Sequence, residues 1–284
     1  MGDQLRKYGF AVIAMHPEWA DELDRMDGLA RKFFSLERDK KERFKHPEHV
    51  RGYCPPGTIS SDTNSFPQWP DSNERLIAGV GRRIPNGSDQ LVSPLERSML
   101  RCLGMAEWVI KTLMQQEAEI AGADPFFGKV ARDEITSQKE PYQQLNFFGH
   151  KDPSVVRKDG EPLQVPHIDL TVATVLFARG SGGQPAPGLT VQLPDGTWTL
   201  LMAEPGEAIV SFQMELPNGV QPMRHFVTNP GEERRLMSQR ISGAAFFNPD
   251  PGQDGVPEMV YQQAFGGAQD MFGQKFEYPD NMVS

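Results

Sequence analysis

Cysteine is scarce in this chain, with Cys54 and Cys102 the only two among 284 residues. They stand far apart, and no C-x-x-C pair is present. This scarcity argues against a disulfide framework and against a cysteine-ligated zinc site, and it favours a reducing compartment. We therefore expect a cytoplasmic protein.

Long hydrophobic runs and an excess of positive charge are also missing. No apolar run approaches the roughly 20 residues that span a bilayer, and the opening residues hold no sustained apolar segment before a cleavage site. Lys and Arg number 29 against 38 Asp and Glu, which gives a formal net charge of −9. Nucleic-acid binding needs a basic face, so this balance disfavours it. We expect no signal peptide, no membrane segment, no nucleic-acid partner and no obligate protein partner.

Two amphipathic helices are predicted in the first half of the chain. A short strand over residues 9–14 precedes a helix over 18–36, where apolar residues recur at three- and four-residue steps. The charged segment 36–44 is expected to be a solvated helix. Residues 50–93 are rich in Pro, Gly, Ser, Asp and Asn, and we expect a long loop region there. A second long helix is predicted over 94–120.

From about Tyr142 the hydrophobic pattern changes to short apolar or alternating runs. Seven of them are separated by DG, PG and NG turn signals: QLNFF, LTVATVLFA, LTVQL, TWTLLM, EAIVSF, HFVTN and RISGAAFF. This pattern is typical of a β-sandwich or jelly roll. We predict one domain, mainly β with flanking helices. It comprises an N-terminal strand and helix region to about residue 135, a jelly-roll (double-stranded β-helix) core over about 136–250, and a loop-like tail over 251–284.

Three residues of the predicted β region form a candidate metal site. His167 and Asp169 make an H-x-D pair at the start of a predicted apolar strand, and residues i and i+2 of a strand point to one face. His225 lies 225 − 167 = 58 residues downstream, in what reads as another strand of the same sheet. Two imidazoles and one carboxylate on one side of an ion leave the opposite side open. That arrangement is typical of non-haem Fe(II) sites that bind a cosubstrate and O2.

Arg240 and Ser242 form a second i, i+2 pair, expected on one face of another strand. This pair decides how the H-x-D pair is interpreted. An H-x-D pair alone often occurs by chance, and a lone histidine is more often structural than a ligand. A guanidinium beside a hydroxyl, however, is well suited to a carboxylate. A buried arginine without an acidic partner is costly, and the neighbouring sequence offers none. We interpret the pair as an anion clamp.

With these residues in place, the chain resembles the 2-oxoglutarate/Fe(II)-dependent dioxygenases of the isopenicillin N synthase-like branch. The resemblance covers nearly the whole chain, through the segments GFAVIAMHP, ARKFFSLERDKKERF, RGYCPPG, QLNFFGHKDP, PGLTVQLPDGTWTLLMAEPGEAIVSF, LPNGVQPMRHFVTNP and RISGAAFFNPDP. The order in which these segments occur is more specific to the family than any single segment.

The resemblance implies roles for individual residues. The three candidate ligands match the iron ligands of the family, and the R-x-S pair matches the anchor of the distal carboxylate of 2-oxoglutarate. Asn146 matches an asparagine that lies near the other end of the cosubstrate in some members. The chain departs from the family at Gln144, where arginine is usual, and at Phe148, where a tyrosine often supports that carboxylate. The interval from His225 to Arg240 is also longer than usual, which implies a longer hairpin.

The resemblance also implies the chemistry. Fe(II), O2 and 2-oxoglutarate, with ascorbate as a reductant, would serve the hydroxylation, desaturation or ring closure of a small-molecule metabolite, with release of succinate and CO2. Asp169 argues against halogenation, because the related halogenases lack that carboxylate. A substrate from specialised metabolism is what the family implies.

The expected substrate pocket follows from strand parity. Ala244 and Phe246 share the inward parity of the R-x-S pair, and Phe148 and Phe212 are further candidates. Two other functions stay open. A relative in the same branch that does not use 2-oxoglutarate would share the R-x-S pair. A non-oxidative, cupin-like metal-binding barrel would carry histidines on strands but has no need of that pair or of flanking helices.

Overall fold

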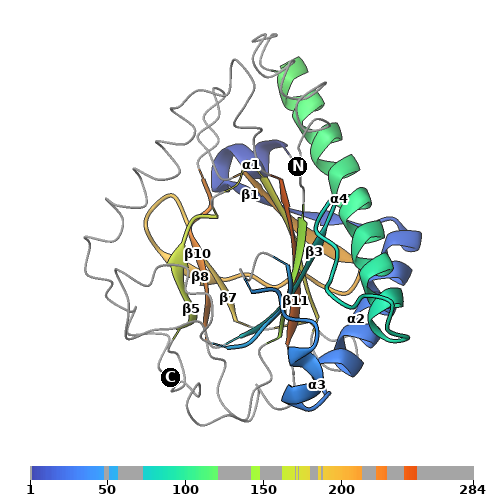
Figure 1. The fold of residues 1–284 in the computed structure, drawn as a ribbon. Coiled ribbons are helices and arrows are strands. Elements are labelled where there is room, and N and C mark those ends of the chain that lie inside the picture. Colours follow the sequence, from blue (N-terminus) through green and yellow to red (C-terminus); the bar gives the residue numbers. More distant parts are fainter. Residues whose placement is uncertain are drawn as a thin grey trace.

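Two β-sheets face each other in the computed structural model, and helices cover the outer side of the larger one (Figure 1). The structure describes residues 2–47, 51–56, 73–120, 142–147, 162–169, 171, 173–179, 185–186, 188–212, 222–228 and 240–247. The helices are α1 (Gly2–Tyr8), α2 (Pro17–Phe34), α3 (Arg38–Glu42) and α4 (Val92–Ile120).

The larger sheet has seven antiparallel strands. Their order across the sheet is β1 (Phe10–Ala14), β9 (Glu207–Phe212), β6 (Ala173–Arg179), β11 (Ile241–Phe247), β4 (Tyr142–Phe147), β3 (Glu74–Gly79) and β2 (Gly52–Cys54). The smaller sheet has four strands, in the order β5 (Pro162–His167), β10 (His225–Thr228), β7 (Leu189–Gln192) and β8 (Trp198–Leu200). The predicted jelly-roll type of fold is confirmed, and all seven strand predictions correspond to strands of these two sheets.

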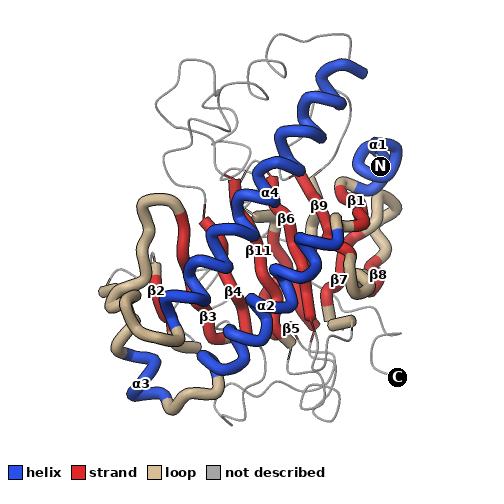
Figure 2. The backbone as a smooth tube through the Cα atoms, turned by 90° about the vertical axis from the view of Figure 1, so that its right-hand side faces the viewer, coloured by secondary structure: helices blue, strands red, loops and turns tan. Residues whose placement is uncertain are grey.

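The long helices α2 and α4 lie across one face of the seven-stranded sheet (Figure 2). α2 begins at Pro17, a residue suited to a first helical turn, and the Nδ1 atom of His16 accepts a hydrogen bond from the Glu18 N–H. The apolar faces of both helices pack on strand residues of one parity, which include Val175, Val210 and Phe247. Among the helices in the described ranges, none has the length and apolar character to cross a membrane.

Strand parity therefore divides the seven-stranded sheet into a helix-covered face and an inner face. On β11, Ile241, Ala245 and Phe247 belong to the helix-side core. Because side chains alternate along a strand, Ser242 and Ala244 point to the inner face, towards the smaller sheet. The same rule applies to β3, β4, β6 and β9, so it decides which residues reach the site.

Two expectations about the N-terminal half are wrong. The region 50–93 is not all loop, because it contains β2 and a fully buried β3 paired with β4. The charged segment 36–44 is not simply solvated either, since Lys41 is 5% exposed. Its Nζ lies 2.6 Å from the Glu74 carboxylate and donates to the Phe34 carbonyl at 3.0 Å. These charges looked like surface residues in the sequence, but they neutralise each other inside the protein.

Candidate metal centre

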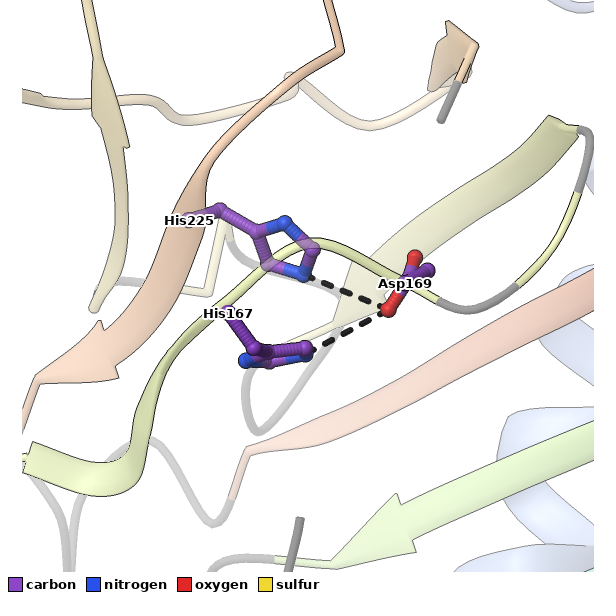
Figure 3. Close-up of side chains that lie close together, drawn as sticks. All are labelled: His167, Asp169 and His225. Atoms are coloured by element: carbon purple, nitrogen blue, oxygen red, sulfur yellow. Dashed lines mark ion pairs between the residues drawn. The ribbon is translucent and has the colours of Figure 1, made fainter. Parts of the chain in front are cut away.

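His167, Asp169 and His225 converge at the edge of the smaller sheet (Figure 3). His167 is the last residue of β5 and His225 the first of β10, and they are register partners in the antiparallel pair. The expectation that both histidines lie in one sheet is confirmed. The expectation that the H-x-D pair begins a strand is wrong, because Asp169 follows β5 in the connection to β6.

The ligand-type atoms of the three residues lie within 4.8 Å of one another. Asp169 Oδ1 is 3.3 Å from His167 Nε2 and 3.7 Å from His225 Nε2. The two imidazole rings are 4.4 Å apart between centroids. In Figure 3 both rings turn a nitrogen towards the same carboxylate oxygen.

Thr174 holds the other oxygen of Asp169. Its hydroxyl donates to Asp169 Oδ2 at 2.8 Å and lies 3.2 Å from the Thr171 hydroxyl. Sequence reasoning missed Thr174, because residue spacing does not reveal its contact with Asp169. Burial raises the pKa of Asp169, but the histidines and the Thr174 hydrogen bond outweigh burial and lower it to about 2. The carboxylate is therefore ionised at neutral pH.

A backbone carbonyl orients His225. The Nδ1 of His225 lies 3.3 Å from the Met223 carbonyl, which can only accept, so Nδ1 carries the proton and Nε2 presents its lone pair to the centre. Burial, followed by repulsion from His167, lowers the pKa of His225 to about 4. The imidazole is thus neutral at pH 7, the form that binds a metal.

This donor set fits a divalent metal of the iron type. Donor atoms at right angles around an ion, each about 2.1 Å from it, lie about 3 Å apart. The observed separations of 3.3 and 3.7 Å need only small side-chain movements to reach that value. Two neutral imidazoles and one carboxylate are the donors of non-haem Fe(II) sites, and they leave the remaining positions open.

Arg240 lies beside the smaller sheet, next to the strand that carries His225. It is 3% exposed, and burial lowers its pKa to about 10, so it stays cationic at neutral pH. Gly188, just before β7, has a φ of +107°. A Cβ atom built there would lie 2.7 Å from the Thr228 carbonyl oxygen, 3.4 Å from Arg240 Nη1 and 3.7 Å from Val227 Cγ1. The guanidinium therefore sits close to Gly188 and Val227.

The other predicted site residues divide between the two faces of the large sheet. Ser242 is buried on the inner face, in register with Asn146 on β4, and Ala244 follows it with the same parity. Phe246 has the same inward parity and is half-buried. Phe212 is a correction: it packs in the helix-side core, because the parity of β9 turns Ser211 inward instead.

Phe148 lies outside the described residues, as do the tail after residue 250 and the long hairpin expected between His225 and Arg240. Both free cysteines, Cys54 and Cys102, are buried, in keeping with the expectation that the chain has no disulfide framework.

A known protein family matches the N-terminal part of the chain. Residues 1–90 match the model of the non-haem dioxygenase in morphine synthesis N-terminal region. No curated protein matches the chain significantly.

Solved structures resemble the chain over most of its length. A full-length Neurospora crassa protein in complex with alpha-KG is 19% identical, with a TM-score of 0.70 over 99% of this chain and 86% of that one. JOX2 in complex with 2OG, Fe and JA is 16% identical, with a TM-score of 0.67 over 99% and 82%. The 2-oxoglutarate complex of AtDAO1 from Arabidopsis thaliana, a dioxygenase for auxin oxidation, is 15% identical, with a TM-score of 0.60 over 89% of each chain. At these identities the likeness shows a shared fold.

Proposed function

We propose that the chain is an Fe(II)- and 2-oxoglutarate-dependent dioxygenase, because its first 90 residues match a non-haem dioxygenase N-terminal model and its fold resembles that of proteins solved with 2-oxoglutarate. Its substrate is a small molecule, which is hydroxylated, desaturated or cyclised with release of succinate and CO2. Specialised metabolism as the setting and a cytoplasmic location stay predictions.

The observation that carries this proposal is a buried cation, Arg240, beside the sheet that carries both metal-site histidines. Arg240 Nη1 and Val227 Cγ1 both lie within 4 Å of the Cβ position of Gly188, and Val227 is two residues after His225 on β10. At about 3.3 Å per strand residue, the backbone positions of His225 and Val227 are roughly 7 Å apart. A short dicarboxylic acid bridges such an interval, with one end at the metal and the other on the guanidinium. A non-oxidative metal barrel has no use for this second anchor.

In this proposal His167, Asp169 and His225 hold Fe(II), and Arg240 and Ser242 bind the distal carboxylate of 2-oxoglutarate. Bound Fe(II) with 2-oxoglutarate and O2 supplies the oxidising power that an unactivated C–H bond requires. Thr174 fixes the Asp169 carboxylate, and Met223 fixes the His225 tautomer. Asn146, the neighbour of Ser242 in the sheet, lies alongside the cosubstrate.

The direct test is O2-dependent conversion of 2-oxoglutarate to succinate by the Fe(II)-loaded protein, in the presence of a panel of small metabolites. We expect succinate formation in the parent chain and a rise in the KM for 2-oxoglutarate of about a hundredfold in Arg240→Met, because a buried charge-assisted carboxylate bond is lost. Arg97→Met, at an exposed position on α4, is the matched control and leaves this KM unchanged. If the protein binds Fe(II) but forms no succinate under any condition, the proposal is contradicted. The alternative that the chain is an oxygenase of the same branch without 2-oxoglutarate dependence is then favoured.

A further inference from the structure

The edge strand β8 of the smaller sheet, with the residues that follow it, carries large apolar side chains that face solvent. Leu201 and Ala203 pack in the core between the two sheets. Because side chains alternate along an extended chain, Trp198, Leu200 and Met202 point to the opposite, outer face of the smaller sheet. Leu200 is 57% exposed and Met202 is 52% exposed. We call these three residues the apolar stripe, and contiguous exposed apolar side chains of this kind mark an interaction site.

The backbone beside the apolar stripe is open for pairing. β8 is the last strand of the smaller sheet, and among the described strands it pairs with β7 alone. The Leu201 N–H donates to the Leu189 carbonyl just inside β7. Alternate residues of an antiparallel strand direct their N–H and C=O groups to opposite sides, so those of Leu200 and Met202 point to the open edge. An open edge with apolar side chains is a template for another strand.

The sequence around β8 suits pairing with an identical strand. Charged residues and prolines usually prevent pairing at a sheet edge, and residues 196–203 contain neither. In an antiparallel pair of two β8 strands centred on Leu200, Trp198 of one copy lies opposite Met202 of the other. Asp195 and Glu204, the first charged residues on either side, do not lie opposite a charged residue in this register. The edge is therefore complementary to itself, as a twofold interface requires.

Arg224 provides a positive charge beside the apolar stripe. Its carbonyl accepts a hydrogen bond from the N–H of Gln192, the register partner of Trp198. The guanidinium carbon lies 5.9 Å from the centroid of the Trp198 ring. Arg224 Nε is buried without a hydrogen-bond partner, and burial alone lowers the pKa of the group. Within the part of the chain that the structure describes, no carboxylate pairs with this arginine, which is costly for a half-buried cation.

The second copy would supply the missing carboxylate. In the register centred on Leu200, Glu204 of the second copy is the diagonal neighbour of Trp198, two residues beyond the residue directly opposite. Diagonal neighbours lie about 7–8 Å apart, within reach of long side chains. Glu204 is exposed, and the guanidinium of Arg224 already lies over the Trp198 ring. The charges of the two copies thus complement each other at both ends of the pair.

We propose that β8 pairs antiparallel with β8 of a second copy about a twofold axis at Leu200, so that the protein forms a homodimer. The two smaller sheets then join into one continuous sheet, with the apolar stripes of both copies on the same face. β10, which carries His225, belongs to the same sheet, so both metal centres lie on this shared layer. The inference does not depend on the proposed function.

Analytical ultracentrifugation of the full chain, at concentrations up to about 100 µM, tests the inference, since a short interface gives a dissociation constant in the micromolar range. We expect a reversible monomer–dimer equilibrium. Leu200→Lys should raise the dissociation constant by about tenfold or more, because two like charges then meet at the axis. Trp108→Lys is the matched control, since Trp108 is also an exposed apolar residue, at 68%, but lies on α4 across the larger sheet (Figure 2). It should leave the dissociation constant unchanged.

A charge exchange tests the contact between the copies. Arg224→Glu and Glu204→Arg should each raise the dissociation constant by about threefold to tenfold, because like charges are brought together. The double variant should return to the parent value, since the pair is restored with its signs reversed. General damage to the fold would instead accumulate in the double variant and would lower the Tm.

Four results would overturn the inference. The first is a parent protein that stays monomeric over the whole concentration range, which would leave the edge to a different partner. The second is a dimer that Leu200→Lys does not weaken, and the third is a dimer that Trp108→Lys abolishes, because α4 would then form the interface. The fourth is a double charge variant that dimerises no better than the single variants.

Discussion

The two oxygens of Asp169 have different tasks at the centre. Oδ1 faces both imidazoles, while Oδ2 accepts the hydrogen bond from Thr174. A carboxylate held in this way has little freedom to rotate, so its donor oxygen is in place before the metal arrives.

Removing that hydrogen bond should weaken the metal site without removing a ligand. We expect Thr174→Val to lower the affinity for Fe(II) by about tenfold or more, as outer contacts of metal ligands typically do. An anaerobic Fe(II) titration measures the change, and Thr174→Ser, which keeps the hydroxyl, is the control. Equal Fe(II) affinity in the valine variant and the parent would mean that Thr174 does not orient Asp169.

Gly188 is the point at which the backbone comes closest to the Arg240 clamp. Its φ of +107° disfavours other residues, and an added methyl group would lie 2.7 Å from the Thr228 oxygen and 3.4 Å from Arg240 Nη1. We expect Gly188→Ala to raise the KM for 2-oxoglutarate by about tenfold or more, because the guanidinium must move. Fe(II) affinity should change little.

A matched variant separates backbone strain from the contact with the clamp. Gly196 in the β7–β8 turn also has a positive φ, +86°, but an added Cβ there meets nothing within 4 Å. Gly196→Ala should therefore cost stability and leave the KM for 2-oxoglutarate unchanged. Equal effects of the two substitutions on that KM would contradict the position inferred for the clamp.

At the scale of elements, a buried ion pair joins α3 to β3. Lys41 Nζ lies 2.6 Å from Glu74 Oε2, and the two side chains are 6% and 2% exposed. Burial, together with a hydrogen bond to Glu74, raises the pKa of Tyr53 on β2. These contacts hold α3, β2 and β3 together.

Breaking one side of this pair should destabilise the fold strongly. We expect Lys41→Met to lower the free energy of unfolding by about 3–5 kcal/mol, since it leaves a buried carboxylate without its cation. The double variant Lys41→Met with Glu74→Leu should be less destabilised than Lys41→Met alone, because the leftover charge is gone. Denaturant unfolding measures both, and additive losses in the double variant would show that the pair is not coupled.

The sequence predicted the strands in which apolar residues alternate regularly. It missed the strand whose charged residues are paired in the protein interior. β6, β9 and β11 have apolar residues on the covered face, so alternation revealed them. β3 was missed because Glu74 and Arg75 look like surface residues, although Glu74 pairs with Lys41 and Arg75 donates to the Asn73 side chain in the interior. Residue spacing brought the H-x-D pair and His225 together, but it could not reveal Thr174, whose contact depends on how β5 connects to β6.

Packing between elements, which the sequence does not show, also explains why Phe212 was wrongly assigned to the substrate pocket. An aromatic residue near the end of a strand is suited equally to a pocket and to a core, and only the parity of β9 against the helices decides between them. Ala244 and Phe246 could be assigned because they were counted from Arg240 on one strand. Parity counted from Arg240 along β11 gave the inward side of Ala244 and Phe246, whereas the sequence offered no way to relate the parity of β9 to that of β11.

At the scale of the whole molecule, the proposed ligands join the two sheets. The three metal-site residues belong to the smaller sheet and its connection to β6, whereas Arg240 precedes β11 of the larger sheet. Fe(II) and 2-oxoglutarate bound together would therefore contact both layers of the sandwich, and folding and binding should be coupled.

This coupling predicts a ligand-dependent rise in thermal stability. At ligand concentrations about 100 times the dissociation constant, binding adds roughly 2.7 kcal/mol to the folded state. The Tm measured without O2 should rise by several degrees with Fe(II), and further when 2-oxoglutarate is added. His225→Ala should show neither rise. A 2-oxoglutarate effect that is the same with and without metal would contradict a shared site.

The central claim is that one site holds Fe(II) through His167, Asp169 and His225 and holds 2-oxoglutarate between that metal and Arg240. The most direct measurement is the visible absorption spectrum of the anaerobic protein with Fe(II), before and after 2-oxoglutarate is added. We predict a weak charge-transfer band that appears only with both ligands, is lost in Asp169→Ala, and needs a much higher 2-oxoglutarate concentration in Arg240→Met. A parent protein that binds Fe(II) yet shows no such band at any 2-oxoglutarate concentration would contradict the account.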